Sequence, residues 1–463
     1  MKILLALHAF PPFSRAGSEN YVEALACELL QRHEVTVLHR VSQPERPEYE
    51  TSEARHGAIP VVRINRSFRD MTRFRDTYRS DAVAERFAAV LDRLRPDVVH
   101  FHHLTCLSTT CVDEAKQRGI PVVCTLHDYW LLCPRGQLLR RDLSLCERHT
   151  DSDCVRCMAY QLRIRGGHQR TRELFGAAAR LARWRLPASI YRRIASRPFA
   201  REEDALGEIR ERTREVLEAC SRVDRFVSPS HFLRDRYTEF GVSAARIEVI
   251  RNGFDTTRWP APRVARSRDA TTPLRVVYLG TWIPSKGVHV LLEAVRSMEP
   301  REVQLDVHGH AVPFEGVEDY EGQLRRLAAG APHIRMGVRY APEDVPALLA
   351  AADVAVVPSI WYENAPLTIQ EAFRAGLPVV ASGHGGLLEF VEHERNGLTF
   401  RPGSSSALRA ALERLAREPG LLDRLRAGVP AVATMHEHAL ELERLYAELG
   451  AGMSPRERVS TSA

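Results

Sequence analysis

The chain has 463 residues, which is too long for one ordinary hydrophobic core, so we expect two domains. Hydrophobic residues make up 44% and charged residues 27%, a composition typical of ordinary globular proteins. The net charge of +6 is spread over many residues and no aromatic platform or known binding module accompanies it, which argues against nucleic acid as a partner.

The sequence favours a cytoplasmic protein. No apolar run approaches the roughly 20 residues needed to span a bilayer. The apolar start, residues 3–10, resembles a short signal peptide, but Pro11-Pro12 ends it and no small-residue cleavage site follows, so we expect a buried first strand. Nine cysteines are an odd number and they are clustered, which is typical of a reducing compartment.

In the first half, apolar runs alternate with segments of helical spacing. The runs are continuous, as in a parallel sheet covered on both faces. They predict strands at residues 2–9, 34–39, 61–64, 97–102, 121–126, 223–228 and 247–250. The segments between them predict helices at 17–32, 81–94 and 106–118.

The pattern lapses at residues 258–273, where prolines, arginines and a Thr-Thr-Pro sequence predict a linker. It then resumes. Strands are predicted at 275–279, 303–307, 334–336, 354–357, 378–381 and 398–400. Helices are predicted at 287–298, 342–352, 366–375, 406–417 and 432–449.

Two successive alternations of strand and helix predict an α/β protein with two facing, doubly wound, Rossmann-like domains at residues 1–262 and 273–430. Ligands of such sheets bind beyond the carboxyl ends of the strands, so the cleft between the domains is the expected site. A terminal helix is expected at residues 431–450, and one arrangement packs it against the first domain. Residues 451–463 are expected to be a disordered tail.

Two carboxylates, Glu363 and Glu371, follow the predicted strand at 354–357. We expect Glu363 in the loop and Glu371 in the first two turns of the next helix, whose free amides at Leu367 and Thr368 form a natural phosphate site. Carboxylates accept pairs of sugar or ribose hydroxyls. The spacing alone is typical of surface charges, but its setting favours a sugar or nucleotide site.

Three further motifs follow predicted strands. Lys286, one of only three lysines in the chain, follows the Gly280 turn and suits a pyrophosphate at a helix start; the alternative is a solvated lysine. Gly17 permits close approach of a phosphate or sugar, or simply a turn. His127, followed by Asp128, is expected to face the cleft, where it can bind a hydroxyl or a developing charge; a structural histidine is the commoner alternative.

These elements resemble glycosyltransferase family 4, the retaining enzymes of the GT-B fold. The matching pieces keep the family's order over nearly the whole chain: Ala16-Gly17, His127-Asp128, Pro229-Ser230, Asn252-Gly253, Pro284 to Gly287, Glu363 to Glu371, and Gly385 to Glu389. The resemblance implies an enzyme that transfers a sugar from a nucleotide-sugar substrate, with retention of anomeric configuration and no organic cofactor.

The resemblance also implies roles for single residues. Glu363 and Asn364 would contact the donor sugar, and Glu371 would bind the ribose. Lys286 would hold the pyrophosphate, helped by the Gly17, Gly280, Leu367 and Thr368 backbone, and His127 would lie beside the anomeric carbon. We expect front-face attack, with the leaving phosphate oxygen helping to take the acceptor's proton.

The sequence departs from the family pattern at two positions. The family often has arginine after the glycine of the Gly280 turn, where this chain has Thr281, so one phosphate-binding charge is missing. The common Gly-Gly of the first loop is Ala16-Gly17. The missing arginine puts in doubt how the leaving group is stabilised, but it does not affect the predicted fold.

Four cysteines lie in one loop, residues 133–157: Cys133, Cys146, Cys154 and Cys157. A Cys-x-x-Cys pair with two more cysteines favours a structural Zn²⁺ site, although the uneven spacing is not that of a standard zinc finger. An iron–sulfur cluster or free thiols are the alternatives.

Residues 161–200 hold ten arginines against one acid, Glu173, within a helical insert expected at about 161–220. One interpretation is a helix that rests on anionic lipid at the inner face of a membrane and brings the enzyme to a lipid-linked acceptor or a cell-surface polysaccharide precursor. A solvated basic face packed on the first domain is an equal alternative.

Two other functions fit parts of the pattern. A GT-B isomerase would use a nucleotide sugar without an acceptor, and it would need more acid and base groups around the sugar. A non-catalytic scaffold subunit that binds a sugar nucleotide is favoured by Thr281 but opposed by the intact Glu363, Glu371 and Lys286. The sequence identifies neither the donor base, nor the sugar, nor the acceptor.

Overall fold

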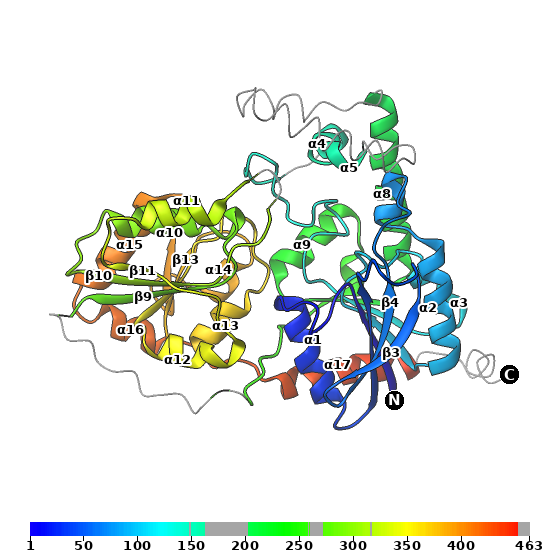
Figure 1. Cartoon of the computed structure of the whole chain (residues 1–463). Helices are drawn as coiled ribbons and strands as arrows, with labels where there is room; N and C mark the ends of the chain where they lie inside the picture. Colours follow the sequence, from blue (N-terminus) through cyan, green and yellow to red (C-terminus); the bar gives the residue numbers. More distant parts are fainter. Residues whose placement is uncertain (148–149, 163–201, 258, 260–271, 315–316, 452–463) are drawn as a thin grey trace.

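The computed structural model describes residues 1–147, 150–162, 202–257, 259, 272–314 and 317–451. It has two lobes, each built on its own sheet (Figure 1). The predicted class, an α/β protein with two Rossmann-like domains, is confirmed.

The first lobe contains an eight-stranded sheet with the order β3-β4-β2-β1-β5-β6-β7-β8. Its strands are β1 Lys2–Leu7, β2 Glu34–Val41, β3 Thr51–His56, β4 Ile59–Asn65, β5 Val98–Phe101, β6 Val122–Thr125, β7 Arg225–Ser228 and β8 Ile247–Val249. Its helices are α1 Gly17–Leu29, α2 Asp81–Leu94, α3 Cys111–Gln117, α4 Asp151–Cys157, α5 Ala159–Leu162, α8 Glu202–Arg222 and α9 His231–Phe240, with 3₁₀ turns η1 Phe74–Thr77 and η2 Ala244–Arg246.

The second lobe contains a parallel six-stranded sheet with the order β11-β10-β9-β12-β13-β14. Its strands are β9 Leu274–Leu279, β10 Val303–His308, β11 Ile334–Met336, β12 Val354–Val357, β13 Val379–Ser382 and β14 Gly397–Phe400. Its helices are α10 Val288–Arg296, α11 Tyr320–Ala328, α12 Val345–Ala350, α13 Leu367–Arg374, α14 Leu387–Phe390, α15 Ser405–Arg417 and α16 Leu421–Ala427, with 3₁₀ turns η3 Pro284–Lys286 and η4 Pro342–Asp344.

Alternate residues of β1 explain why its apolar run is continuous. Leu4 and Ala6 pack into a core shared with α2, α3, α8 and α9, whereas Leu5 and Leu7 pack into the core on the opposite face. Because successive side chains of a strand point to opposite faces, a sheet covered on both sides needs apolar residues at every position.

The last helix, α17 (Met435–Ala451), packs against the first lobe. Its apolar residues share a core with β1 and α1, and Figure 1 shows it lying beside α1. The chain therefore passes between the lobes twice. The two passages are hydrogen-bonded to each other, from Phe254 N to Ala433 O (2.9 Å) and from Met435 N to Phe254 O (2.9 Å).

Two differences from the sequence prediction stand out. The prediction lacks β3, an antiparallel edge strand with no apolar run. The helix expected at 106–118 is only α3, because the Ser108 hydroxyl accepts hydrogen bonds from the Ser80 and Thr110 backbone and holds the preceding residues in a loop. Most of the linker, the basic insert and the tail lies outside the described residues. No helix in the described ranges is long and apolar enough to cross a membrane.

Candidate active site

Glu363 is the centre of a polar cluster at the carboxyl end of β12. Its Oε1 accepts hydrogen bonds from Lys286 Nζ (2.7 Å), the Ser359 hydroxyl (2.6 Å) and Trp361 Nε1 (2.8 Å). Glu363 is only 4% exposed, whereas the Lys286 side chain is 30% exposed. The structure thus joins two predicted site residues that lie 77 positions apart in one ion pair.

Gly287 explains how the Lys286 loop reaches this cluster. Its backbone has φ +69°, and a Cβ there would lie 1.9 Å from the carbonyl oxygen of Pro358. Any side chain would push the loop off the end of β12, so glycine is needed for this close approach. Lys286 ends η3, immediately before α10, and its ammonium group also lies 5.3 Å from the centroid of the Trp361 ring.

Glu371 lies on α13, one turn from the helix start at Leu367. Burial raises the pKa of its carboxyl group to about 7. No hydrogen bond or ion pair to this side chain is found within the described part of the chain, in contrast to Glu363. A carboxylate that is partly withdrawn from water without a protein donor is suited to receiving hydroxyl donors from a ligand.

The start of α1 in the first lobe and the start of α13 in the second lie close together. A Cβ on Gly17, the first residue of α1, would lie 4.0 Å from Leu367 Cδ1 at the first turn of α13. Thr368 follows in the same turn. Free amides and the positive ends of two helix dipoles therefore converge on one region, an arrangement that favours a bound phosphate or pyrophosphate.

His127 and Asn364 connect the two lobes. The Asn364 amide donates to the carbonyl oxygen of His127 (2.8 Å), and the Tyr129 hydroxyl donates to the carbonyl oxygen of Tyr362 (3.1 Å). Asn364 Oδ1 is buried without a hydrogen-bond partner. Burial, with the nearby imidazoles of His103 and His8, lowers the pKa of His127 to about 3, so its ring is neutral at physiological pH.

Sequence reasoning missed the other polar residues around His127. His103 Nε2 lies 3.0 Å from Asp128 Oδ2, and His102 Nδ1 lies 3.2 Å from His127 Nε2. His8 lies near the buried Glu19, at 3.7 Å. The signal was present, because His8, His102 and His103 all follow the carboxyl ends of central parallel strands, β1 and β5.

Gly280 and Glu389 have structural surroundings that the sequence did not predict. Gly280 has φ +153°. Trp282, the residue directly after Thr281, is buried in the core. Glu389 of α14 accepts hydrogen bonds from His231 N (2.9 Å) and Phe232 N (2.6 Å), the first residues of α9 in the other lobe.

The four cysteines of the 133–157 loop line one small cavity of about 20 Å³, beside Arg135 and Asp153. Burial raises the pKa of the Cys146 thiol to about 11 and that of Cys154 to about 12, and it also raises the pKa of Cys157. Within the described residues, however, no group of three or more His, Cys, Asp or Glu side chains is arranged to hold a metal ion. The four cysteines therefore lie around one cavity, but the positions of their side chains do not support a zinc site.

Two parallel-sheet lobes with carboxylates, a lysine and two helix starts at the cleft define the architecture of the two-domain glycosyltransferases. The family model "Glycosyltransferase Family 4" matches residues 15–161 and 168–258, and the model "Glycosyl transferases group 1" matches residues 264–440. The chain belongs to glycosyltransferase family 4.

Curated relatives match parts of the chain. Glycogen synthase of Mycobacterium tuberculosis is 33% identical over 204 residues, which are 43% of this chain and 47% of that protein. A GDP-mannose-dependent alpha-(1-6)-phosphatidylinositol monomannoside mannosyltransferase of the same species is 32% identical over 213 residues, 43% of this chain and 52% of that protein. The matches span about half the length of these relatives.

Solved structures match nearly the whole chain. HepE from Anabaena, in complex with UDP, has a TM-score of 0.62 at 17% identity, and the alignment covers 97% of this chain and all of that one. Sucrose-phosphate synthase from Thermosynechococcus elongatus has a TM-score of 0.63 at 18% identity, with 98% and 100% covered. At these identities the likeness establishes the fold alone.

Proposed function

We propose that the chain is an enzyme that transfers a sugar from a nucleotide-sugar donor to a saccharide acceptor. The observation that carries this proposal is the Lys286–Glu363 pair (2.7 Å), in the loop that leads into the start of α13, where Leu367 approaches Gly17 of α1. A pyrophosphate there would meet free amides and an ammonium group, while the neighbouring carboxylates would meet the hydroxyls of sugar and ribose. HepE, with UDP in its crystal, and the GDP-mannose-dependent relative support a nucleotide-sugar substrate without naming the base for this chain.

In this proposal each side chain has a stated task. Glu363 and the unpartnered Asn364 Oδ1 accept hydrogen bonds from the donor sugar, and Glu371 accepts them from the ribose. Lys286 leaves Glu363 and binds the leaving pyrophosphate. Its charge there replaces part of the charge of the arginine that the family often has where this chain has Thr281. A neutral His127 donates a hydrogen bond to the sugar and stays uncharged, in agreement with its low pKa of about 3.

Retention by front-face attack belongs to the same proposal. Glu363 already accepts three hydrogen bonds at one oxygen, so it positions and stabilises rather than attacking the anomeric carbon. An α-linked nucleotide sugar should therefore give an α-linked product, which is visible in the anomeric proton coupling by NMR. A β-linked product, or a trapped glycosyl-enzyme adduct, would contradict this part.

The activity itself is tested by turnover. Purified protein is incubated with UDP-, GDP- and ADP-sugars, with and without extracted lipid-linked oligosaccharides and soluble polysaccharides, and the released nucleotide is measured. Release that depends on the acceptor supports a transferase. A new nucleotide sugar formed without acceptor would support the isomerase, and binding without any turnover would support the scaffold.

We also propose, from the sequence, that residues 161–200 bring the enzyme to an anionic membrane surface carrying its acceptor. Most of this segment lies outside the described residues, and its ten arginines carry the argument. Flotation with phosphatidylglycerol vesicles should carry the full-length protein upward at low salt, with less bound at high salt. Protein that stays at the bottom of the gradient would remove this part.

A structural Zn²⁺ held by Cys133, Cys146, Cys154 and Cys157 is the last part of the proposal. Its support is the Cys-x-x-Cys pair with two further cysteines in the sequence, together with the fact that all four residues line one cavity of about 20 Å³. An ion there would deprotonate the thiols despite their raised pKa values. Elemental analysis of protein purified without chelator should find one zinc per chain, lost in Cys154→Ser but kept in Cys27→Ser. Absence of both zinc and iron would overturn it.

A further inference from the structure

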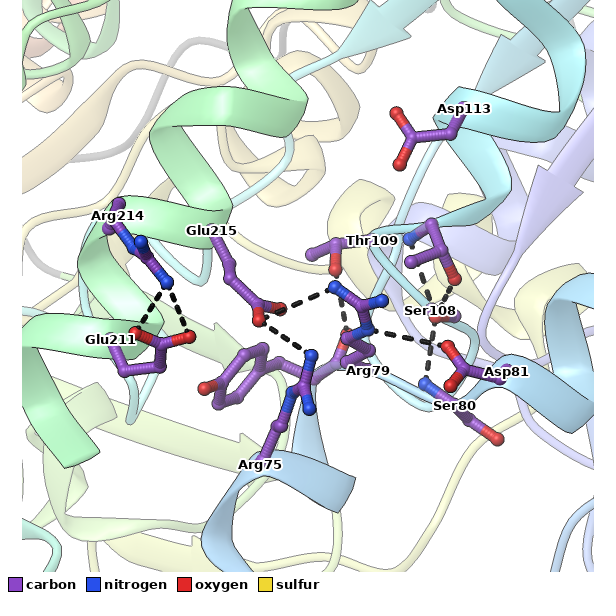
Figure 2. A network of polar contacts seen from close by, with 12 residues as sticks. Arg75, Arg79, Ser80, Asp81, Ser108, Thr109, Asp113, Glu211, Arg214 and Glu215 are labelled. Carbon is purple, nitrogen blue, oxygen red and sulfur yellow. Dashed lines mark hydrogen bonds and ion pairs between the residues drawn. The ribbon is translucent and has the colours of Figure 1, made fainter. Parts of the chain in front are cut away.

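A polar cavity of about 350 Å³ lies in the first lobe, outside the cluster around Glu363. Its walls come from Tyr49 and from the segment 66–82, which joins β4 to α2. Figure 2 shows one side of it, where Arg75 and Arg79 meet Glu215 of α8, with Ser80 and Asp81 nearby. Its volume is at the lower end of the range for small-molecule sites, enough for one or two sugar rings.

The cavity lies at the edge of the sheet where the candidate active site is found. Segment 66–82 leaves the carboxyl end of β4, and β4 runs parallel to β2 and, through it, to β1, β5 and β6. The loop after β5 joins the two places. Its Leu107 carbonyl accepts a hydrogen bond from Arg66 at the cavity, while its His103 contacts Asp128 beside His127.

Arg66 is the decisive residue. It is only 2% exposed, its guanidinium donates to the carbonyl oxygens of Leu107 and Asp76, and its Nε is buried without a hydrogen-bond partner. In the described part of the chain no carboxylate lies within ion-pairing distance of it. The Phe68 ring lies 4.4 Å from the guanidinium and offsets part of the cost of burial, but no carboxylate neutralises the charge, which favours an anion supplied from outside.

Arg75 depends on one shared carboxylate, whereas Arg79 also pairs with Asp81 (3.3 Å). Arg75 and Arg79 share the same oxygen of the buried Glu215, at 3.0 and 3.4 Å, and Arg75 Nε is buried without a partner. The acids of the cavity wall are already engaged: Asp76 accepts from two backbone amides, Asp70 from the Tyr49 hydroxyl and Asp81 from Arg79. The buried Nε atoms of Arg66 and Arg75 are left as donors without a partner, beside one unpartnered acceptor, Glu215 Oε2.

We propose that this cavity is an acceptor subsite for a sugar unit that carries a negative charge, either a carboxylate or a phosphate. The inference rests on the proposed transferase function and names the class of its acceptor. The anionic group meets Arg66 and the Arg75–Arg79 pair, whose planar guanidinium groups match carboxylate and phosphate oxygens. The sugar hydroxyls meet Thr72, Ser80 and the carboxylates of the wall.

Binding of three matched probes tests the inference: glucuronate, glucose 6-phosphate and glucose. Each is titrated into full-length protein saturated with the nucleotide that stabilises it, and affinity is measured by ligand-observed NMR. We expect at least one charged probe to bind about tenfold more tightly than glucose, because charge-assisted hydrogen bonds are lost with the neutral sugar. Preference for glucuronate indicates a uronic acid, and preference for glucose 6-phosphate indicates a phosphorylated acceptor.

Variants complete the test. Arg79→Gln and Arg66→Gln should each reduce binding of the preferred probe by about tenfold, since each removes a charge-assisted contact. Replacement of the buried Arg66 endangers folding, so the more exposed Arg79 provides a second variant. Arg69→Gln is the control: its side chain is half exposed, pairs with Glu48, and lies in the same segment but outside the cavity wall.

The outcomes separate this inference from the proposed function. Equal binding of glucose and both charged probes, or charged-probe binding unchanged in Arg66→Gln and Arg79→Gln, would overturn the subsite. Each variant should keep the thermal shift produced by nucleotide, because the donor cluster around Glu363 is untouched. If wild-type protein binds no nucleotide, the proposed function itself is refuted, whatever the charged probes do.

Discussion

At the scale of the residue, Glu371 gives a pH-dependent prediction. Burial raises its pKa to about 7, above the ordinary value of 4.5, so the folded protein favours the protonated form. This contribution to stability is fully present below about pH 4.5 and is lost as pH rises through 7. Ribose binding has the opposite dependence, because the ionised carboxylate is the better acceptor, and nucleotide affinity should rise over the same window.

Glu371→Gln tests both trends. Without nucleotide, the variant should lose the decline in thermal midpoint between pH 5 and pH 8 that wild type shows. Its nucleotide affinity should be about tenfold to hundredfold lower at pH 8, because hydrogen bonds to a charged group are lost. Glu392→Gln, an exposed glutamate of the same lobe, is the control. A variant that keeps wild-type affinity at pH 8 would exclude Glu371 from the nucleotide site.

The Lys286–Glu363 pair gives a second prediction at this scale. Glu363→Gln keeps the shape of the side chain but weakens contacts to the donor sugar, so the free nucleotide should bind normally while turnover falls by about 10²- to 10³-fold. Lys286→Ala should weaken both the nucleotide and the nucleotide sugar, because its charge meets the pyrophosphate. Calorimetry with the two ligands separates these patterns, and identical losses in both variants would contradict the assigned division of roles.

At the scale of the element, α9 and α14 form a contact between the lobes. The Glu389 carboxylate accepts from the first two amides of α9, where the helix dipole favours a negative charge. Close by, a Cβ on Gly253 would lie 2.8 Å from Met435 Cα, where the two passages between the lobes cross. We therefore expect the lobes to hinge at this crossing, with the Glu389 contact acting as a latch that resists opening.

Glu389→Gln should therefore favour opening without unfolding either lobe. The cost is about 1 kcal/mol, because a charged cap of a helix start is replaced by a neutral one. Small-angle X-ray scattering should show a larger radius of gyration for the variant without ligand, and the same radius as wild type when nucleotide closes the cleft. If the radius matches wild type in both states, Glu389 does not act as a latch.

Elements with continuous apolar runs or with helical spacing of apolar residues were predictable from the sequence, whereas β3, which has neither, was not. The predicted and observed bounds of β11, β12 and α2 agree because their neighbours are polar or turn-forming. β3 was missed because its residues alternate between half-buried and exposed positions, and pairing with β4 makes it a strand. Such an edge strand depends on a partner that local sequence cannot show.

At the scale of the whole molecule, the sequence predicted which segments reach the cleft but not which side chains meet there. Glu363, Glu371 and Lys286 were predicted from their positions after strands, yet the pairing of Lys286 with Glu363 depends on the close packing that Gly287 permits. The His103–Asp128 contact joins the ends of two strands, and the arginine-lined cavity brings Tyr49 against the segment 66–82, so neither leaves a local motif.

A thermal-shift screen tests whether the region around Glu363 and Lys286 binds a nucleotide sugar. UDP, GDP, ADP and their common sugar conjugates are each added to purified protein, because a ligand that binds only the folded state raises the midpoint. We predict a rise with one base, larger for its sugar conjugate, that Lys286→Ala and Glu371→Ala abolish while Arg69→Gln preserves it. No rise with any of these ligands, in protein that is folded by circular dichroism, would contradict the account.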